Sequence, residues 1–132
     1  MTEKRLNVLI IEDSENDTLL LVRELTREGY AVSYARVEDE ESMRKSLQDG
    51  EFDVVISDHA MPRFDSLEAL RVLGESGKDI PFIIVSGSIG EEVAVGAMKA
   101  GAHDYIMKNN LSRLVPAVER EIVEAGIRRE KR

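Results

Sequence analysis

The sequence predicts an α/β fold, a doubly wound, five-stranded parallel sheet with five flanking helices. Five short apolar runs alternate along the chain with five segments whose apolar residues recur at helical spacing. The runs are apolar at consecutive positions, as expected of parallel strands that are covered on both faces. With 132 residues, the chain is long enough for one domain with one sizeable core.

The predicted strands are bounded by glycine, proline and polar residues. They comprise the segments LNVLII (6–11), YAVSYA (30–35), FDVVIS (52–57), PFIIVS (81–86) and HDYIMK (103–108). Pro81 is tolerated in the fourth because it is the first residue of that strand, where no ladder hydrogen bond is needed.

Each of the first four predicted helices begins at polar or acidic residues that suit a helix N-terminus and ends at a glycine. The ranges are 14–29, 38–50, 65–77, 88–101 and a last helix from about residue 111. Their apolar residues are Leu19, Leu20, Val22 and Leu25; Met43 and Leu47; Leu67, Leu70 and Leu73; Val93, Ala94, Ala97 and Met98; and Leu114, Val118, Ile122 and Ala125. Ser14–Asp17 and Ser88–Glu91 have capping-box spacing, and Pro116 must lie near the first turn of the last helix.

No linker or repeat interrupts this pattern, so we expect one domain over residues 1–125. Residues 126–132 end in the charged run RREKR, which is compatible with a helix. This segment is either a solvated helical tail or the start of a linker.

The composition excludes several functions. A formal net charge of −8 argues against direct nucleic-acid binding, which needs clustered Lys and Arg. The absence of cysteine excludes disulfides, thiolate nucleophiles and cysteine zinc sites, and His59 and His103 lack a metal-binding spacing. The apolar run 6–11 is too short for a signal peptide or a membrane span, so we expect a cytoplasmic protein without membrane contact.

Chemically active side chains follow four of the predicted strands. Glu12 and Asp13 follow the first strand, Asp58 follows the third, Ser86 ends the fourth and Lys108 ends the fifth. Functional groups in an open parallel sheet collect beyond the carboxyl ends of its strands, so these side chains are expected to converge.

The chemistry of this set points to phosphoryl transfer. Three neighbouring carboxylates repel one another and need a cation, and an all-oxygen site suits Mg²⁺. A carboxylate such as Asp58 can attack phosphorus, while Lys108 and Ser86 can contact the phosphoryl oxygens. Each residue alone is also explained as an ordinary turn, helix-terminus or surface residue; the convergence of all of them favours a site.

These residues resemble the receiver domain of two-component response regulators. The matching segments are LIIEDS, VISDHAMP, IIVSGS and HDYIMK, within a resemblance that covers about residues 5 to 125. The resemblance implies the flavodoxin-like strand order 2-1-3-4-5 and a signalling switch rather than a metabolic enzyme. It implies that Asp58 accepts a phosphoryl group from a partner histidine kinase or phosphotransfer protein.

The same resemblance implies a role for each matching residue. Glu12, Asp13, Asp58 and the backbone carbonyl of Ala60 would hold Mg²⁺, Ser86 and Lys108 would contact the phosphoryl group, and Tyr105 would move with Ser86 on switching. Two departures stand out. Asn109 replaces the proline that usually follows the lysine, and Asp65-Ser66 stands where many members have glycine.

Output to a downstream partner or domain is expected through the fourth and fifth helices and the fifth strand, around 93–99 and Tyr105. Gly96 lowers the stability of the fourth helix by about 1 kcal/mol relative to alanine, which suits an element that shifts. The chain is a stand-alone receiver, a phosphorelay shuttle or an N-terminal module of a larger protein. Its segments look most like receivers that precede sensory and kinase domains.

Three other functions share parts of this pattern. A haloacid-dehalogenase-type phosphatase resembles a scheme with a second aspartate two residues after the nucleophile, where this chain has Ala60. A flavodoxin-like electron carrier needs a phosphate loop after the first strand, where Glu12 and Asp13 would repel a phosphate. A receiver-like interaction module that is never phosphorylated would not require Asp13, Asp58 and Lys108.

Overall fold

The computed structural model describes residues 4–87 and 90–131. The strands are β1 (Lys4–Ile11), β2 (Tyr30–Val37), β3 (Val54–Ser57), β4 (Phe82–Ser86) and β5 (Asp104–Met107). The helices are α1 (Glu15–Arg27), α2 (Glu40–Asp49), α3 (Ser66–Ser76), α4 (Glu91–Lys99) and α5 (Leu114–Glu130), with a 3-10 helix, η1 (Lys108–Arg113), before α5. Every predicted strand and helix is present, and Pro116 lies in the first turn of α5, as predicted.

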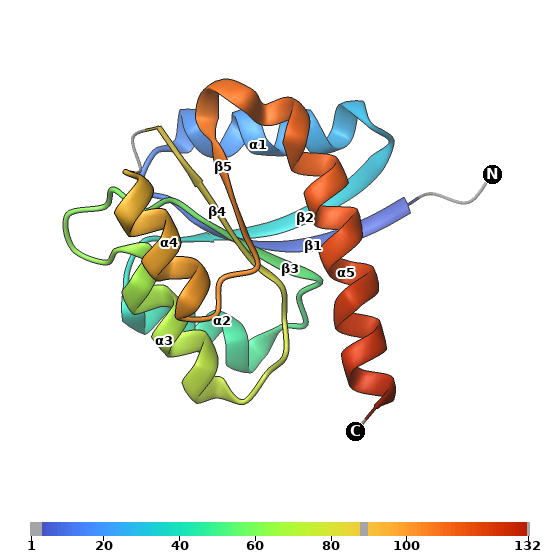
Figure 1. Cartoon of the computed structure of the whole chain (residues 1–132). Coiled ribbons are helices and arrows are strands. Elements are labelled where there is room, and N and C mark those ends of the chain that lie inside the picture. Colours follow the sequence, from blue (N-terminus) through green and yellow to red (C-terminus); the bar gives the residue numbers. More distant parts are fainter. Residues whose placement is uncertain (1–3, 88–89, 132) are drawn as a thin grey trace.

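The strands form one parallel sheet in the predicted order, β2-β1-β3-β4-β5 (Figure 1). Its register aligns the ends of neighbouring strands, because Ile11 of β1 pairs with Ser57 of β3 and Ser86 of β4 pairs with Met107 of β5. Within each of these two pairs the strands therefore end level with each other, and the residues that follow them are brought to one edge of the sheet.

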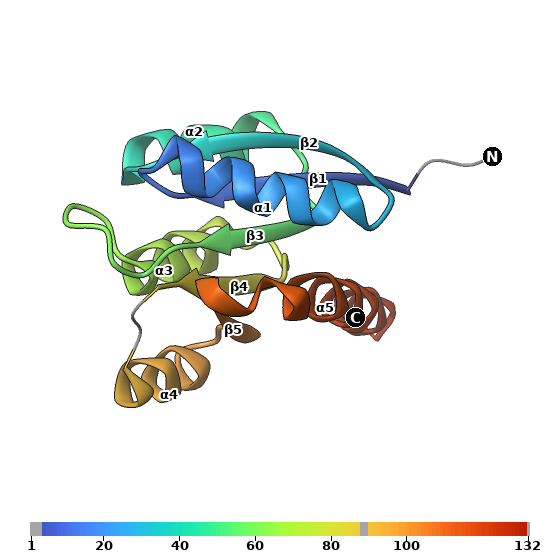
Figure 2. The same cartoon turned by 90° about the horizontal axis from the view of Figure 1, so that it is seen from above.

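Helices cover both faces of the sheet, as seen from two directions in Figures 1 and 2. Successive residues of the central strands point to opposite faces, so Val55 packs under α2, α3 and α4 whereas Ile56 packs under α1 and α5. Both layers are apolar, which explains why β3 and β4 read as continuous apolar runs.

The apolar stripe predicted for α1 was partly wrong. Leu19 and Leu20 are 52% and 47% exposed, whereas Thr18, Leu21 and Leu25 are buried. Positions 18, 21 and 25 share one helix face. Thr18 can be buried on that face because its hydroxyl donates a hydrogen bond to the Ser14 carbonyl oxygen at 2.9 Å. Leu67 of α3 and Val93 and Met98 of α4 are likewise exposed.

Helix N-termini follow the sequence pattern in three of the five helices. Ser14 and Asp39 accept hydrogen bonds from backbone N–H groups at the start of α1 and α2, and Asp65 and Glu68 form a reciprocal capping box on α3. The predicted cap Ser88 lies outside the described residues, and α4 begins after Gly90. Helix α5 continues without a break past residue 125 to Glu130.

Candidate functional site

Asp58 is the first residue after β3 and lies at the edge of the sheet. The four residues of β3 are fully buried, and the Asp58 N–H donates to the carbonyl oxygen of Ile11 at 2.9 Å, which extends the ladder by one step. The side chain is consequently fixed beside the end of β1 and is only 7% exposed. A carboxylate in such a place needs a compensating charge or a proton.

Glu12 and Asp13 reach the same place from β1. The N–H of Glu12 donates to the Val37 carbonyl oxygen at 3.0 Å, and Arg36 Nη1 donates to the Glu12 carbonyl oxygen at 3.1 Å, so β1 is held on its β2 side as well. One carboxylate oxygen each of Glu12, Asp13 and Asp58 lies within 4.8 Å of the others, with Glu12 and Asp58 buried and Asp13 exposed. We call these three residues the acidic cluster.

The acidic cluster has more negative charge than the protein compensates. Burial, followed by repulsion from Asp58, raises the pKa of Glu12 from its ordinary 4.5 to about 7. The attraction of Lys108 and a hydrogen bond from the Ser14 N–H act in the opposite direction but are outweighed. The folded protein therefore stabilises a fully ionised cluster poorly unless a cation joins it.

Lys108 is the ammonium group that reaches the cluster. It follows β5 and opens η1, and its Nζ lies 3.4 Å from both Asp58 Oδ2 and Glu12 Oε2. Partial burial lowers the pKa of Lys108, but a hydrogen bond to Asp17 and the charges of Glu12 and Asp58 outweigh burial and raise it. Lys108 is thus held in its charged form.

Asp17 is a member of the site that the sequence did not indicate. In the sequence it is an acidic residue at the third position of the α1 capping box, but its Oδ2 lies 2.7 Å from Lys108 Nζ. Helix α1 begins immediately beyond the acidic cluster, so its first turn lies at the same edge of the sheet. That proximity, rather than a motif, is the pattern that would have pointed to Asp17.

Ser86 and Tyr105 lie on the β4 and β5 side of the site. Ser86 is fully buried, and its Oγ has no hydrogen-bond partner among the residues that the structure describes. A Cβ placed on Gly87 would lie 3.8 Å from Cδ of Lys108, so the end of β4 is beside the lysine stem. Tyr105 is half-buried against the α2–α3–α4 layer. The unpartnered buried hydroxyl of Ser86, one residue before the glycine that lies beside the lysine, is available to a group that enters the site.

The loop after Asp58 is fixed at both ends. The Ala60 N–H donates to Asp58 Oδ1 at 3.3 Å, and His59 Nδ1 lies 2.7 Å from the buried hydroxyl of Ser66, the first residue of α3. Ser66, noted in the sequence only as a departure from the family pattern, therefore anchors the residue next to Asp58. Ala60, whose carbonyl is the predicted ligand, lies two residues after Asp58 and is exposed.

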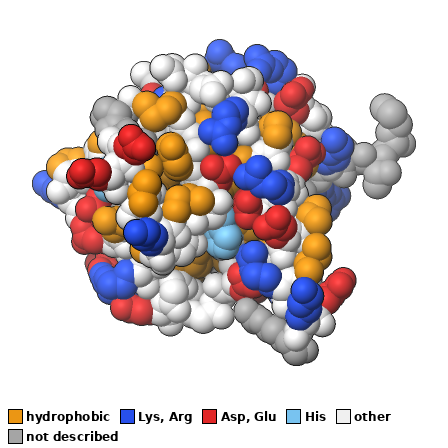
Figure 3. Space-filling view, in the orientation of Figure 1, with side chains coloured by type: hydrophobic (Ala, Val, Ile, Leu, Met, Phe, Trp, Pro, Cys, Tyr) orange, Lys and Arg blue, Asp and Glu red, His pale blue; other side chains and the backbone are white. Residues whose placement is uncertain are grey.

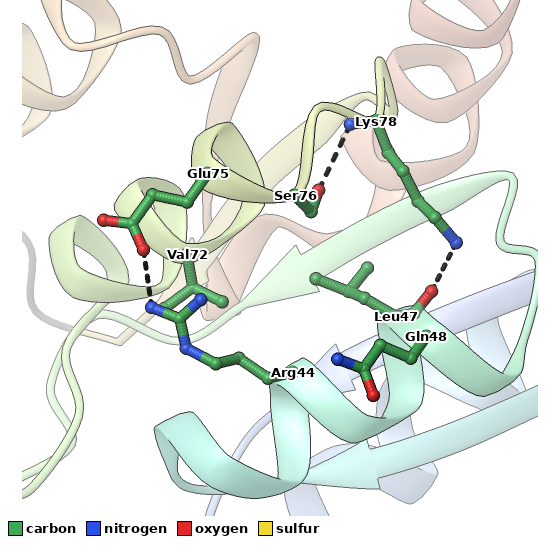
Figure 4. Close-up of a pocket in the computed structure, with 7 residues that line it drawn as sticks. All are labelled: Arg44, Leu47, Gln48, Val72, Glu75, Ser76 and Lys78. Carbon is green, nitrogen blue, oxygen red and sulfur yellow. Dashed lines mark hydrogen bonds and ion pairs between the residues drawn. The ribbon is translucent and has the colours of Figure 1, made fainter.

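A pocket between α2 and α3 offers less chemistry. Figure 4 shows that Arg44 and Glu75 pair across its mouth and that Lys78 donates to the carbonyl oxygen of Leu47 at the end of α2. Arg44 and Glu75 are paired with each other, Lys78 donates to a backbone carbonyl oxygen, and no residue that lines this pocket belongs to the acidic cluster. The carboxyl edge of the sheet is the stronger candidate site.

Comparison with known proteins identifies the family of the chain. Residues 8–119 match the family model described as the response regulator receiver domain. The chain belongs to that family. The receiver is 31% identical over 117 residues to the DNA-binding transcriptional regulator NtrC of Proteus hauseri, covering 88% of this chain and 24% of that protein. It is also 31% identical over 129 residues to the nitrogen assimilation regulatory protein NtrX of Azorhizobium caulinodans, covering 96% and 28%.

Solved receiver structures share the fold. The crystal structure of FixJ-N is 32% identical with a TM-score of 0.76 and covers 92% of this chain and 95% of that one. NtrX from Brucella abortus in complex with ADP is 26% identical with a TM-score of 0.83, covering 96% of this chain and 29% of that one.

The receiver spans about a quarter of the length of the NtrC and NtrX relatives. Among its described helices, none is both long enough and apolar enough to cross a membrane.

Proposed function

We propose that this receiver is a phospho-accepting switch in which Asp58 takes a phosphoryl group from a partner histidine kinase or phosphotransfer protein. The observation that carries the proposal is the position of Asp58, buried at the end of β3 within the acidic cluster and 3.4 Å from Lys108 Nζ. Membership of the response regulator receiver family supports it and disfavours a haloacid-dehalogenase-type phosphatase.

The chemistry needs one nucleophile and compensation of charge. A carboxylate oxygen of Asp58 forms a bond to phosphorus as the bond from phosphorus to the donor atom breaks, and the bonding electron pair leaves with the donor. The product is an acyl phosphate on Asp58. Lys108 places a positive charge beside the oxygens that gain charge in this step, which is the main requirement for phosphoryl transfer.

The donor atoms of the acidic cluster fit Mg²⁺. Carboxylate oxygens without histidine or cysteine are the ligands that a hard divalent ion prefers, and Glu12, Asp13, Asp58 and the Ala60 carbonyl would hold it. A Mg²⁺ ion held by these residues would supply positive charge that compensates the cluster and the charge that develops on the phosphoryl group. The raised pKa of Glu12 supports this assignment, because burial first and the neighbouring Asp58 carboxylate second disfavour its ionised form, and the attraction of Lys108 does not outweigh them.

The switch would run from Ser86 to the α4–β5–α5 surface. The unpartnered Ser86 hydroxyl can donate to a phosphoryl oxygen, and Tyr105 on the neighbouring strand would move with it. Helix α4 contains Gly96 and exposes Val95 at 47%, and Figure 3 shows hydrophobic side chains gathered over this helix. An exposed apolar surface on a weakened helix supports the proposal that a downstream partner or domain binds there.

We propose further that the receiver acts as a switch in the cytoplasm and is not a metabolic enzyme, with catalysis confined to its own phosphorylation and dephosphorylation. The relatives NtrC and NtrX are about four times as long as the matched region. Output through a further domain or a separate protein therefore forms part of the proposal.

Intact-mass analysis after incubation with acetyl phosphate tests this function. The wild-type protein is expected to gain one phosphoryl group in the presence of Mg²⁺ and none in EDTA. Asp58→Asn, which has the same size, is expected to gain none under either condition. A wild-type protein without an adduct, even with a histidine kinase, would mean that the receiver is an interaction module.

A further inference from the structure

Lys108 makes its shortest contact with a carboxylate outside the acidic cluster. Its Nζ lies 2.7 Å from Asp17 Oδ2 but 3.4 Å from Asp58 Oδ2 and from Glu12 Oε2. The Asp17 contact is a short, charge-assisted hydrogen bond, whereas the other two are at the outer limit for one. In the unphosphorylated protein the ammonium is thus drawn toward α1 and away from the nucleophile.

The backbone fixes Asp17 in this place. Its N–H donates to Ser14 Oγ at 3.2 Å, and the N–H of Thr18 donates to the Ser14 carbonyl oxygen at 3.1 Å, so the first turn of α1 is closed directly beyond the acidic cluster. Asp17 is not one of the described residues whose oxygens converge in that cluster. Its carboxylate therefore faces the lysine without belonging to the group that would hold a cation.

We propose that Asp17 is a positioning residue that competes with Asp58 for Lys108, holding the ammonium in the unphosphorylated protein and releasing it as the phosphoryl group forms. This inference rests on the proposed function. It assigns to α1 a restraint on phosphorylation, made by a residue that holds neither the ion nor the phosphoryl group.

The direction of the effect follows from charge. Phosphorylation changes the charge at Asp58 from −1 to roughly −2, judged from other phosphorylated side chains, and the phosphoryl oxygens then attract Lys108 more strongly than Asp17 does. Moving the ammonium breaks the Asp17 ion pair, whose side chains are 26% and 35% exposed. The loss of the Asp17–Lys108 ion pair offsets part of the attraction between Lys108 and the phosphoryl group, so Asp17 slows phosphoryl transfer to Asp58.

Asp17→Asn removes the charge and keeps the size of the side chain and the backbone N–H that Ser14 caps. The initial rate of phosphoryl adduct formation from acetyl phosphate at saturating Mg²⁺ is expected to rise about two- to fivefold, the scale of one partly exposed ion pair. The matched control is Glu15→Gln, which removes a charge from the same helical turn. Glu15 is 82% exposed and lies near Arg36 rather than Lys108. The rate of adduct formation in Glu15→Gln is therefore expected to stay at the wild-type value.

A Lys108→Met background distinguishes positioning from a general electrostatic or structural effect, as in a double-mutant cycle. Asp17→Asn is expected to leave the rate of Lys108→Met unchanged. A rise in that background, an equal rise in Glu15→Gln, or a fall in Asp17→Asn alone would overturn the inference. If the wild type forms an adduct at the same rate as Asp17→Asn, only this inference fails; if it forms none, the proposed function fails with it.

Discussion

Two groups of charged residues in this receiver differ in how their charges are balanced. On the outer surface of α2 and α3, Glu40 and Glu75 each contact both Arg44 and Arg71 at 2.6–2.9 Å, so two carboxylates meet two guanidinium groups. At the carboxyl edge of the sheet, Lys108 is the one cationic side chain among the described residues that pairs with carboxylates of the acidic cluster and with Asp17. Arg36 contacts this group only at the backbone carbonyl oxygen of Glu12.

The pKa values move in opposite directions in the two groups. Hydrogen bonds from arginine lower the pKa of Glu40 and Glu75, whereas burial and repulsion raise that of Glu12. The balanced group is exposed and links two helices. The unbalanced group includes two buried carboxylates and is expected to bind added positive charge. The difference teaches that surplus charge, and not charge density, distinguishes the site from ordinary surface ion pairs.

Glu12→Gln should reveal the surplus most strongly. The folded protein retains the Glu12 proton up to about pH 7, and the unfolded chain loses it near 4.5, so this residue makes the free energy of unfolding fall as pH rises through that window. In EDTA at pH 8, Glu12→Gln is expected to be more stable than wild type by up to about 3 kcal/mol, with little difference at pH 4. Urea unfolding at both pH values measures this, and a variant that is less stable at pH 8 would contradict it.

Lys108→Met should act in the other direction. Removing the ammonium leaves buried carboxylates uncompensated, which is expected to cost about 2 kcal/mol of unfolding free energy in EDTA, below the range for fully buried pairs because Lys108 is partly exposed. Mg²⁺ is expected to reduce this loss. Lys45→Met, at an exposed position on α2, is the control for loss of a lysine, and equal losses in the two variants would refute the argument.

Ser86→Ala should make the protein slightly more stable, although it removes a residue of the candidate site. The buried hydroxyl lacks a partner among the described residues, so its removal is expected to raise the unfolding free energy by about 1 kcal/mol. Ser57→Ala is the matched control, because Ser57 is equally buried but donates to the Asp58 carbonyl oxygen at 2.9 Å, and it should lose stability. Urea unfolding that shows both serine variants destabilised alike would contradict the assignment.

Glu40→Gln should have the smallest effect. It removes one partner from the exposed network of α2 and α3, so a slight loss of stability is expected, and high salt should abolish it. Urea unfolding at low and high ionic strength checks this. A loss as large as that of Lys108→Met would mean that the comparison between the two groups is wrong.

The sequence predicted the sheet and the strand-end residues because both depend on short patterns. Continuous apolar runs such as β3 and β4 mark strands buried on both faces, and register brings the next residues together. The sequence did not predict which face of α1 is buried. Leu19 and Leu20 are as apolar as Leu21, and only the crossing over the sheet decides which of them packs inside.

Contacts between side chains on different elements were also beyond the sequence. Asp17 and Lys108 are 91 residues apart, and an acidic residue in the first turn of a helix has an ordinary explanation as a favourable charge at its N-terminus. The sequence did not predict the hydrogen bond between His59 and Ser66 for a similar reason, since a serine at the start of a helix such as α3 is an ordinary feature. These contacts depend on how α1 and α3 dock, which no local pattern specifies.

The central claim is that the acidic cluster is short of positive charge and is built to gain it. The most direct measurement is urea unfolding of wild type and Asp58→Asn in EDTA and with increasing Mg²⁺. Asp58→Asn is expected to be more stable than wild type in EDTA, and wild type should gain about 2.7 kcal/mol when Mg²⁺ reaches 100 times its dissociation constant, with a much smaller gain in the variant at the same concentration. An Asp58→Asn protein less stable than wild type in EDTA, together with a wild type that Mg²⁺ does not stabilise, would contradict the claim.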